Sequence, residues 1–228
     1  MQFRFSLSYQ LTKILQCSHK DAVAFCRKGQ ILVDQSPETN PRRILGIHEE
    51  IRLNEVVIRK GKSFCSIAFY KPPGFECTAN RAIENNIYTL LPPEYQDLFS
   101  LGRLDTNSEG LLLLTNDGRV YRQIMTEEAK IEKEYLVHTH FPISKSLEEA
   151  FTRPFLLGQR WTLPAHFEQI GDFSFKVILT EGINRQIRRI CAKNGNQVRQ
   201  LIRIRFGEHN LGNMKIGECR ALTPIIGN

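Results

Sequence analysis

One segment of the sequence combines residue types that could do acid–base or nucleophilic chemistry. Residues 102–118 read Gly-Arg-Leu-Asp-Thr-Asn-Ser-Glu-Gly-Leu-Leu-Leu-Leu-Thr-Asn-Asp-Gly, which places Asp105 in a polar stretch between two apolar runs. A loop between two strands is a common place for catalytic residues, because the strands hold it in position. Arg103 would favour the ionised carboxylate and orient it. An aspartate at a strand end is also a common turn or cap residue, so both interpretations stay open here.

A second segment gathers arginines toward the end of the chain. Arg185, Arg188 and Arg189 fall in an expected helix at residues 184–193, where spacings of three and four place them on one side. The formal net charge is +7, and residues 176–228 hold ten Lys or Arg against three Asp or Glu. This clustering predicts a polyanionic partner, since neutralising phosphates releases counterions. A solvated basic face is the alternative.

These segments resemble the motifs of the pseudouridine synthases of the ribosomal small-subunit type. The resemblance runs without a gap through residues 102–118, where it implies that Asp105 is the catalytic carboxylate and Arg103 its partner. Three more stretches match in the expected order. They are Tyr-Lys-Pro-Pro-Gly at residues 70–74, Glu-Lys-Glu-Tyr-Leu-Val at 132–137 and Glu-Gly-Ile-Asn-Arg-Gln-Ile-Arg-Arg-Ile at 181–190.

The resemblance implies a role for individual residues in each stretch. Tyr135 would stack on uracil and move a proton with its hydroxyl, although a half-buried strand aromatic is the alternative. Arg188 would reach the catalytic carboxylate. Asp105 would attack the ribose C1′ or the uracil ring, or assist elimination to a glycal, and these three routes stay open. Lys71, Arg185 and Arg189 would support the site or bind the RNA.

The implied activity is isomerisation of specific uridines to pseudouridine in structured RNA. Ribosomal RNA is the expected substrate, and transfer RNA is a further candidate. Breaking and remaking a glycosidic bond at one carboxylate needs no cofactor or metal, and the sequence holds no P-loop, no G-x-G-x-x-G motif after a strand and no His/Cys cluster. The main alternative is a non-catalytic RNA-binding or ribosome-assembly factor with the same fold. A methyltransferase would need a Gly-rich cofactor loop, which we do not find.

Residues 1–60 are predicted to form a small separate domain. Helices are expected at residues 7–16 and 22–28, strands at 30–34 and 50–58, a loop at 35–41 and a linker at 59–62. This order resembles the small RNA-binding domain of ribosomal protein S4. The resemblance implies that Lys20, Arg27 and Lys28 grip phosphates. A cap that only packs on the main domain is the alternative.

Residues 62–228 are predicted to form the catalytic domain. The pattern shows strands interrupted by short helices without regular βαβ alternation, which predicts an α+β fold. The resemblance adds a pseudouridine synthase fold with a mixed, mainly antiparallel sheet and a central active-site cleft. Strands are expected at residues 64–70, 100–104, 110–115, 132–141, 165–170, 173–180 and 198–206, and an amphipathic segment at 119–125.

The remaining composition predicts where the protein works. No run of about 18 uncharged apolar residues occurs, as a membrane-spanning helix would require, and the N-terminal residues lack the apolar core of a secretion signal. The six cysteines form no C-x-x-C pair. We therefore expect a cytoplasmic protein with reduced thiols. Because nothing in the sequence suggests a long amphipathic seam, we expect a monomer.

Overall fold

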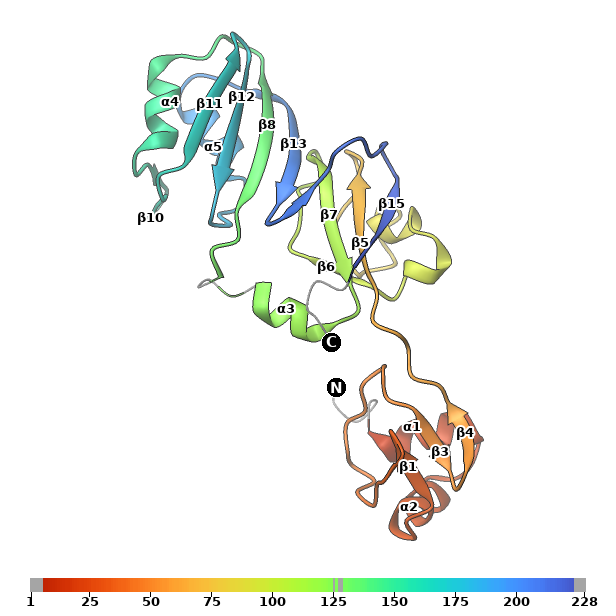
Figure 1. Ribbon diagram of the computed structural model, residues 1–228. Helices are drawn as coiled ribbons and strands as arrows, with labels where there is room; N and C mark the ends of the chain where they lie inside the picture. Colours follow the sequence, from red (N-terminus) through yellow and green to blue (C-terminus); the bar gives the residue numbers. More distant parts are fainter. Residues whose placement is uncertain (1–5, 125, 127–128, 224–228) are drawn as a thin grey trace. The chain divides into compact units, whose positions relative to one another are not determined.

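The computed structural model describes residues 6–124, 126 and 129–223 (Figure 1). The chain divides into two compact units, Met1–Phe64 and Cys65–Asn228. Within the described residues, no helix is long and apolar enough to cross a membrane. All six cysteines are free thiols.

The N-terminal unit packs two short helices against a small antiparallel sheet. Ser18 caps the second helix: its hydroxyl oxygen accepts from the Asp21 backbone N–H at 3.2 Å, and the hydroxyl donates to the Asp21 carboxylate at 2.6 Å. Leu7, Leu11 and Ile31 are fully buried in its apolar core. The helices are α1 (Leu7–Leu15) and α2 (His19–Arg27), and the strands are β1 (Ile31–Val33), β2 (Ser36–Pro37), β3 (Ile51–Leu53) and β4 (Val56–Arg59), in the order β2-β1-β3-β4.

The single strand expected at residues 50–58 is wrong, because the chain reverses in its middle. Asn54 has φ of 54°, in the left-handed region that asparagine tolerates better than most residues. Leu53 therefore pairs with Val56 across a tight turn, and β3 and β4 form a hairpin. The loop expected at residues 35–41 likewise contains the two residues of β2, which pair with β1.

The C-terminal unit is built on one nine-stranded sheet. Every strand pair in it is antiparallel except β13 with β7, so the sheet is mixed and mainly antiparallel, as expected. Its order is β11-β12-β8-β13-β7-β5-β15, with β6 beside β7 and β14 beside β13. The strands are β5 (Ser66–Lys71), β6 (Phe99–Leu101), β7 (Glu109–Thr115), β8 (Lys133–Thr139), β11 (His166–Gly171), β12 (Ser174–Leu179), β13 (Val198–Phe206), β14 (His209–Asn210) and β15 (Cys219–Leu222).

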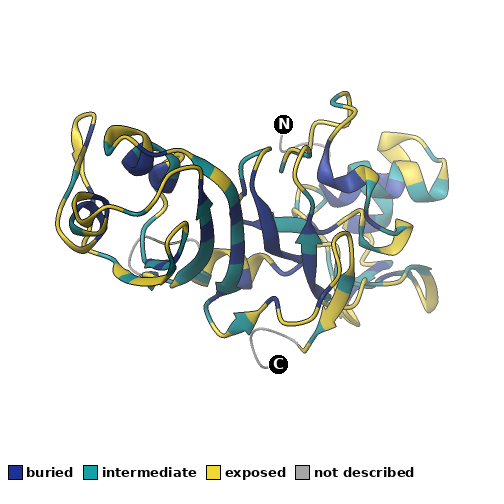
Figure 2. Cartoon of the chain, turned by 90° about the horizontal axis from the view of Figure 1, so that it is seen from above, coloured by how far each residue is buried: buried dark blue, intermediate teal, exposed yellow. Residues whose placement is uncertain are grey.

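The leucine run in β7 explains why this strand lies at the centre. Successive side chains of a strand point to opposite faces. Leu112 and Leu114 pack in one apolar cluster with Ile67 and Phe69, while Leu111 and Leu113 pack in another on the opposite face. Both faces of β7 are therefore buried, and the middle of the sheet is dark blue in Figure 2.

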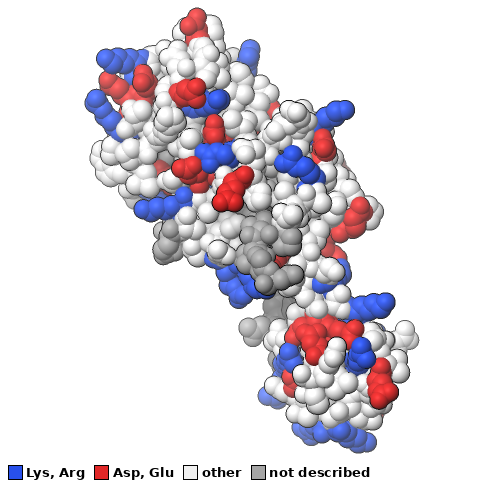
Figure 3. Space-filling model, viewed as in Figure 1, with Lys and Arg blue, Asp and Glu red and all other residues white. Residues whose placement is uncertain are grey.

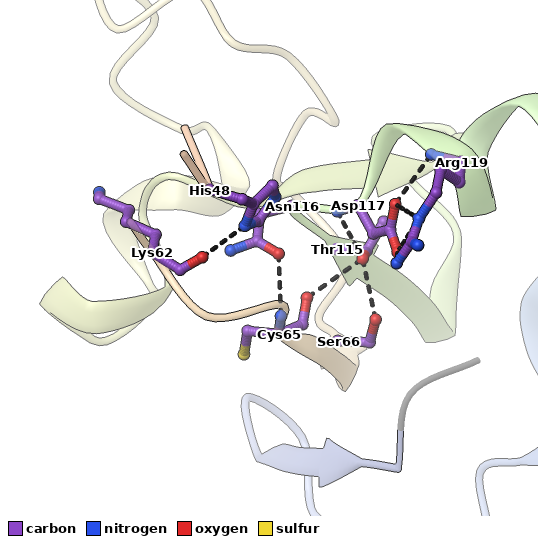
Figure 4. A network of polar contacts seen from close by, with 8 residues as sticks. All are labelled: His48, Lys62, Cys65, Ser66, Thr115, Asn116, Asp117 and Arg119. Atoms are coloured by element: carbon purple, nitrogen blue, oxygen red, sulfur yellow. Dashed lines mark hydrogen bonds and ion pairs between the residues drawn. The ribbon is translucent and has the colours of Figure 1, made fainter. Parts of the chain in front are cut away.

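A polar network joins the adjoining ends of β5 and β7 (Figure 4). The Ser66 hydroxyl donates to Thr115 Oγ1 at 2.8 Å, and Thr115 donates in turn to the carbonyl of Cys65 at 3.1 Å. The Cys65 N–H donates to Asn116 Oδ1 at 2.8 Å. The turn after β7 is thus fixed to the start of β5, and helix α3 (Gly118–Ile124) follows it. Met125, the last residue of the segment expected at 119–125, lies outside the described residues.

Two helices cover the β11-β12-β8-β13 half of the sheet on one face (Figure 1). The sequence pattern did not predict α4 (Lys145–Thr152), although Ser144 accepts from the Leu147 N–H and caps it. Leu147 and Phe151 of α4 pack with Ile187 of α5 (Gln186–Lys193) in the core of this half. The remaining elements are α3 (Gly118–Ile124), the 3₁₀ turns η2 (Ile87–Thr89) and η3 (Pro93–Tyr95), and the hairpin strands β9 (Leu156–Leu157) and β10 (Arg160–Trp161).

Candidate active site

The Asp105 loop, residues 102–108, connects β6 to β7 and is held by hydrogen bonds to its own carbonyls. It begins at Gly102, whose φ of 75° lies in the region that favours glycine. The Ser108 N–H donates to the Asp105 carbonyl at 3.0 Å, and the Gly74 N–H donates to the Thr106 carbonyl at 2.7 Å. Gly74 belongs to the Lys-Pro-Pro-Gly turn, so this turn supports the loop that carries Asp105.

Lys71 also donates hydrogen bonds to the Asp105 loop. Its side chain is 0% exposed, and Nζ donates to the carbonyls of Pro72, Thr106 and Ser108 at 2.9, 3.3 and 2.8 Å. Burial lowers the pKa of Lys71, while nearby groups that include Asp105 act in the opposite direction. Of its two expected roles, supporting the site or binding the RNA, the geometry of Lys71 fits the first, because its ammonium group is enclosed by protein carbonyls.

Arg188, on α5, is a second side chain that donates hydrogen bonds to the Asp105 loop. Its Nη2 donates to the Asn107 carbonyl at 2.7 Å and to Ser108 Oγ at 3.3 Å, and Nη1 donates to the Val198 carbonyl at 3.3 Å. Burial lowers the pKa of Arg188, the neighbouring Arg185 lowers it further, and Asp105 raises it. Arg188 thus contacts the loop that carries Asp105, and its hydrogen bonds within that loop go to residues that follow the aspartate.

The carboxylate of Asp105 forms an ion pair with Arg185. Arg185 Nη1 lies 3.7 Å from Asp105 Oδ2, and the aspartate side chain keeps 27% of its surface exposed. Arg185 is not on the helix as expected: it is the N-cap residue of α5, with φ of 51°. That left-handed backbone removes it from the helical row with Arg188 and Arg189. Arg103, expected as the partner, is exposed, and the described residues show no ion pair between it and Asp105.

The carboxylate faces a large cleft. Its volume is about 1370 Å³, and its lining includes Asp105, Arg103, Tyr135 and Arg185. Sheet register places Tyr135 here, since Tyr135 on β8 pairs with Arg203 on β13, and Arg203 pairs with Gly110 on β7. Four of the sequence-predicted residues therefore line one cleft: Asp105, Arg103, Tyr135 and Arg185.

Arg203 is a residue of this site that the sequence analysis did not single out. It is 2% exposed and lines the cleft, and its Nε donates to the Leu111 carbonyl at 2.7 Å. Among the described residues, its Nη2 has no hydrogen-bond partner. Gly110 allows this arrangement, because a Cβ there would lie 2.4 Å from the Arg203 carbonyl oxygen. The alternating arginines of residues 198–206 were the available signal.

The basic residues predicted in the N-terminal unit lie on its surface. Lys20, Arg27 and Lys28, hereafter the α2 cations, are all exposed on or directly after α2. On the face seen in Figure 3, Lys and Arg atoms gather at the lower end of this unit, where Figure 1 places α2. In the other unit, Arg189 is partly exposed, and its Nη1 donates to the Asn184 carbonyl at 3.4 Å.

Comparison with known proteins identifies the family. The family model described as RNA pseudouridylate synthase matches residues 66–193. The chain belongs to this family. The matched range includes the Asp105 loop, Tyr135 and α5, so most of the cleft lining lies within it, and Arg203 follows it in the chain.

Individual relatives agree with the family match. The dual-specificity RNA pseudouridine synthase RluF of Escherichia coli (strain K12) is 29% identical over 209 residues, which cover 91% of this chain and 71% of that protein. An uncharacterized RNA pseudouridine synthase of Rickettsia felis is 29% identical over 224 residues, covering 95% and 98%. The chain also matches a crystal structure of a pseudouridylate synthase. The match covers 96% of each chain, with 26% identity and a TM-score of 0.68.

Two predictions from the sequence are confirmed at this level. The chain has the α+β pseudouridine synthase fold, and it is an RNA pseudouridine synthase. Among the described residues, no group of three or more His, Cys, Asp or Glu side chains could hold a metal ion.

Proposed function

We propose that this enzyme isomerises specific uridines to pseudouridine in structured ribosomal RNA, with Asp105 as the catalytic carboxylate. One observation carries the proposal: Asp105 faces the cleft from a loop in which the carbonyls of residues 105–108 each accept a hydrogen bond. A loop held this completely places its carboxylate with little freedom, which is what a positioned catalytic group requires.

The product has the same composition as the substrate, and the hydrogen on uracil C5 is exchanged with solvent. The bond between ribose C1′ and uracil N1 breaks, the base turns, a bond forms between C1′ and C5, and the proton on C5 leaves as N1 gains one. An ionised carboxylate beside C1′ would attack that carbon or the ring, or remove a proton to give a glycal. Arg185 can orient this carboxylate, because its Nη1 lies 3.7 Å from Asp105 Oδ2.

Tyr135 and Arg103 complete the proposed substrate site. Tyr135 lines the cleft, where its ring would stack on uracil and its hydroxyl would move a proton. A uridine in a stacked helix cannot reach Asp105, so the target base must leave its stack. Arg103 is exposed at the same cleft and is available to bind the RNA backbone. We assign Arg188 to positioning of the Asp105 loop and Arg189 to phosphate contacts.

We further propose that the two units have different functions, RNA docking and catalysis. Residues 1–60 would act as an S4-like RNA-docking domain through the α2 cations, and residues 62–228 as the catalytic domain. Exposed Lys and Arg side chains on one helix suit phosphate binding, which depends on charge rather than base identity. An enzyme that modifies ribosomal RNA works where ribosomes are, so we place it in the cytoplasm. We also expect the enzyme to be a monomer. Transfer RNA remains a second substrate class to test.

Tritium release from uracil C5 tests the proposal. Unmodified ribosomal RNA transcripts and transfer RNA, each labelled at C5, are incubated with wild type, Asp105→Asn and the control Asp172→Asn, which changes an exposed aspartate in the turn after β11. We expect release by wild type and Asp172→Asn only, while Asp105→Asn keeps its fold and binds RNA. Release by Asp105→Asn at the wild-type rate would contradict the proposal.

The assay also separates the alternative function. A non-catalytic RNA-binding or ribosome-assembly factor would bind the transcripts tightly and release no tritium, either from free RNA or from partly assembled ribosomal particles. Testing those particles excludes a substrate that forms only during assembly.

A further inference from the structure

An exposed apolar strip lies on the β9–β10 hairpin and the residues that follow it. Trp161 is 63% exposed, Leu163 49% and Leu156 42%. Two of the alternate positions are buried: Leu157 and Thr162 are each 3% exposed, and Leu157 packs in the core with α4 and α5. Trp161 pairs directly with Leu156 across the hairpin. One face of the hairpin is thus anchored, and the other presents a large aromatic ring to solvent.

The strip is fastened to the walls of the catalytic cleft. The Leu163 N–H donates to Glu181 Oε1 at 3.0 Å, and Gln186 at the start of α5 donates to the same oxygen at 2.7 Å. Lys193 Nζ, at the other end of α5, donates to the Leu156 carbonyl at 3.3 Å. Both Trp161 and Leu163 line the cleft that contains Asp105. The hairpin is therefore held to the helix whose N-cap residue pairs with the catalytic carboxylate.

Cations surround this apolar strip. Arg160 precedes Trp161, is exposed and lines the same cleft. Arg189 Nη2 would lie 3.5 Å from a Cβ placed on Gly158, in the hairpin turn, and Lys193 reaches Leu156. An exposed aromatic ring among cations is how proteins bind unpaired nucleotides, because the base stacks on the ring while the cations neutralise its phosphates. A protein partner with an apolar surface would make no favourable contact with these cations.

We propose that the strip centred on Trp161 is a stacking site for an unpaired base of the RNA that lies next to the target uridine in the cleft. The proposal rests on RNA as the substrate and adds a second recognition point beyond the reacting base. Arg160 and Arg189 bind the phosphates on either side. The enzyme thereby prefers uridines whose neighbour is unpaired.

The protein contains one tryptophan, so its intrinsic fluorescence reports on this site directly. A ten-nucleotide single-stranded RNA of mixed sequence is titrated into the full-length protein, and binding is followed separately by anisotropy of a dye at the 5′ end. An abasic ribose-phosphate chain of equal length provides the same charge without bases. We expect the RNA to quench the fluorescence of Trp161 with the same Kd that anisotropy gives, and the abasic chain to bind without quenching.

Three results would overturn the proposal. The first is unchanged fluorescence when anisotropy shows saturation with RNA. The second is equal quenching by the abasic chain. The third is a fluorescence change that follows protein concentration without RNA, which would make the strip a contact between copies of this chain. Tritium release by wild type, measured in parallel, separates the two claims: release without stacking refutes only this inference, and stacking without release refutes only the catalytic one.

Substitutions give a second, independent readout. We expect Trp161→Ala to weaken binding of the ten-nucleotide RNA roughly tenfold, as loss of one stacked base does elsewhere, and Trp161→Phe to keep most of the affinity. The control is Phe173→Ala, which removes an exposed aromatic side chain in the β11–β12 turn and outside the cleft lining. Equal affinity in Trp161→Ala and Phe173→Ala, with thermal unfolding showing both folded, would contradict the proposal.

Discussion

Two sets of cations that look alike in the sequence behave differently in the structure. Lys71, Arg188 and Arg203 are buried or half-buried. Lys71 and Arg188 donate to backbone carbonyls of the Asp105 loop, and Arg203 donates to the Leu111 carbonyl in β7. The α2 cations are exposed on the N-terminal unit. The first set fixes protein backbone, and the second is open to a polyanion. A count of basic residues does not separate these roles, because burial and carbonyl partners decide between them.

The difference has an energetic basis. A buried cation loses its hydration, and it is tolerated only where protein acceptors replace the lost water. Three carbonyls do this for Lys71. Exposed cations keep their water and are screened by salt, so they contribute little to folding and remain available for phosphates. Substitutions should therefore affect stability and kcat in the first set, and RNA affinity in the second.

The largest effect is expected for Lys71→Met. The change leaves the buried carbonyl of Ser108 and the partly buried carbonyl of Pro72 without this donor, and the loss at Ser108 alone costs about 1–3 kcal/mol of unfolding free energy. A loop displaced by about 1 Å should lower kcat roughly a hundredfold or more. Urea unfolding and tritium release measure both quantities. Lys145→Met, at an exposed position, is the control, and equal behaviour of the two variants would remove Lys71 from the first set.

A smaller effect is expected for Arg188→Ala. Loss of the bonds to Asn107 and Ser108 loosens one side of the loop and should lower kcat by about tenfold to a hundredfold, with little change in KM for RNA. Arg188→Lys should recover only part of the rate, since an ammonium group cannot reproduce the planar fork. A raised KM with unchanged kcat would instead assign Arg188 to RNA binding. Arg199→Ala, at an exposed position on β13, is the control.

Replacing all three α2 cations by glutamine should lower the affinity for RNA and leave kcat unchanged. We expect the slope of log Kd against log salt to fall by roughly 0.7–0.9 for each phosphate that is no longer neutralised. Affinity measured between low and moderate salt tests this, with Arg42→Gln, an exposed change in the same unit, as control. A decrease in affinity that does not depend on salt would contradict the assigned role.

Much of the fold was predictable because its signals are local. The buried leucines of β7 and the serine cap of α2 depend on residues within a few positions of each other. The Asn54 turn was missed because the residues around it alternate like one continuous strand. The position of β15 was also missed, since only its pairing with β5, about 150 residues earlier in the chain, makes it a strand.

The sequence predicted which residues form the site better than it predicted the contacts between them. Motif resemblance brought Asp105, Tyr135 and Arg185 together, and the cleft contains all three. It did not reveal that Arg185, not Arg103, pairs with Asp105, because that ion pair depends on the left-handed backbone of Arg185 at the start of α5. Nor did it reveal the burial of Lys71, which follows from the fold of the turn after β5. Both facts depend on tertiary structure.

The smallest expected effect concerns pH and distinguishes Lys71 from the α2 cations once more. Burial lowers the pKa of Lys71 below its ordinary value of 10.5. Between the folded and unfolded pKa values the unfolded chain binds more protons at this residue, so its contribution to stability rises as pH increases through that interval. The difference in unfolding free energy between wild type and Lys71→Met should therefore widen as the pH rises toward 10.5 in urea titrations. Replacing an α2 cation should produce no such trend, because these side chains are exposed in the folded protein. A difference that narrows with pH would mean that the carbonyls around Lys71 favour its charged form more strongly than burial opposes it.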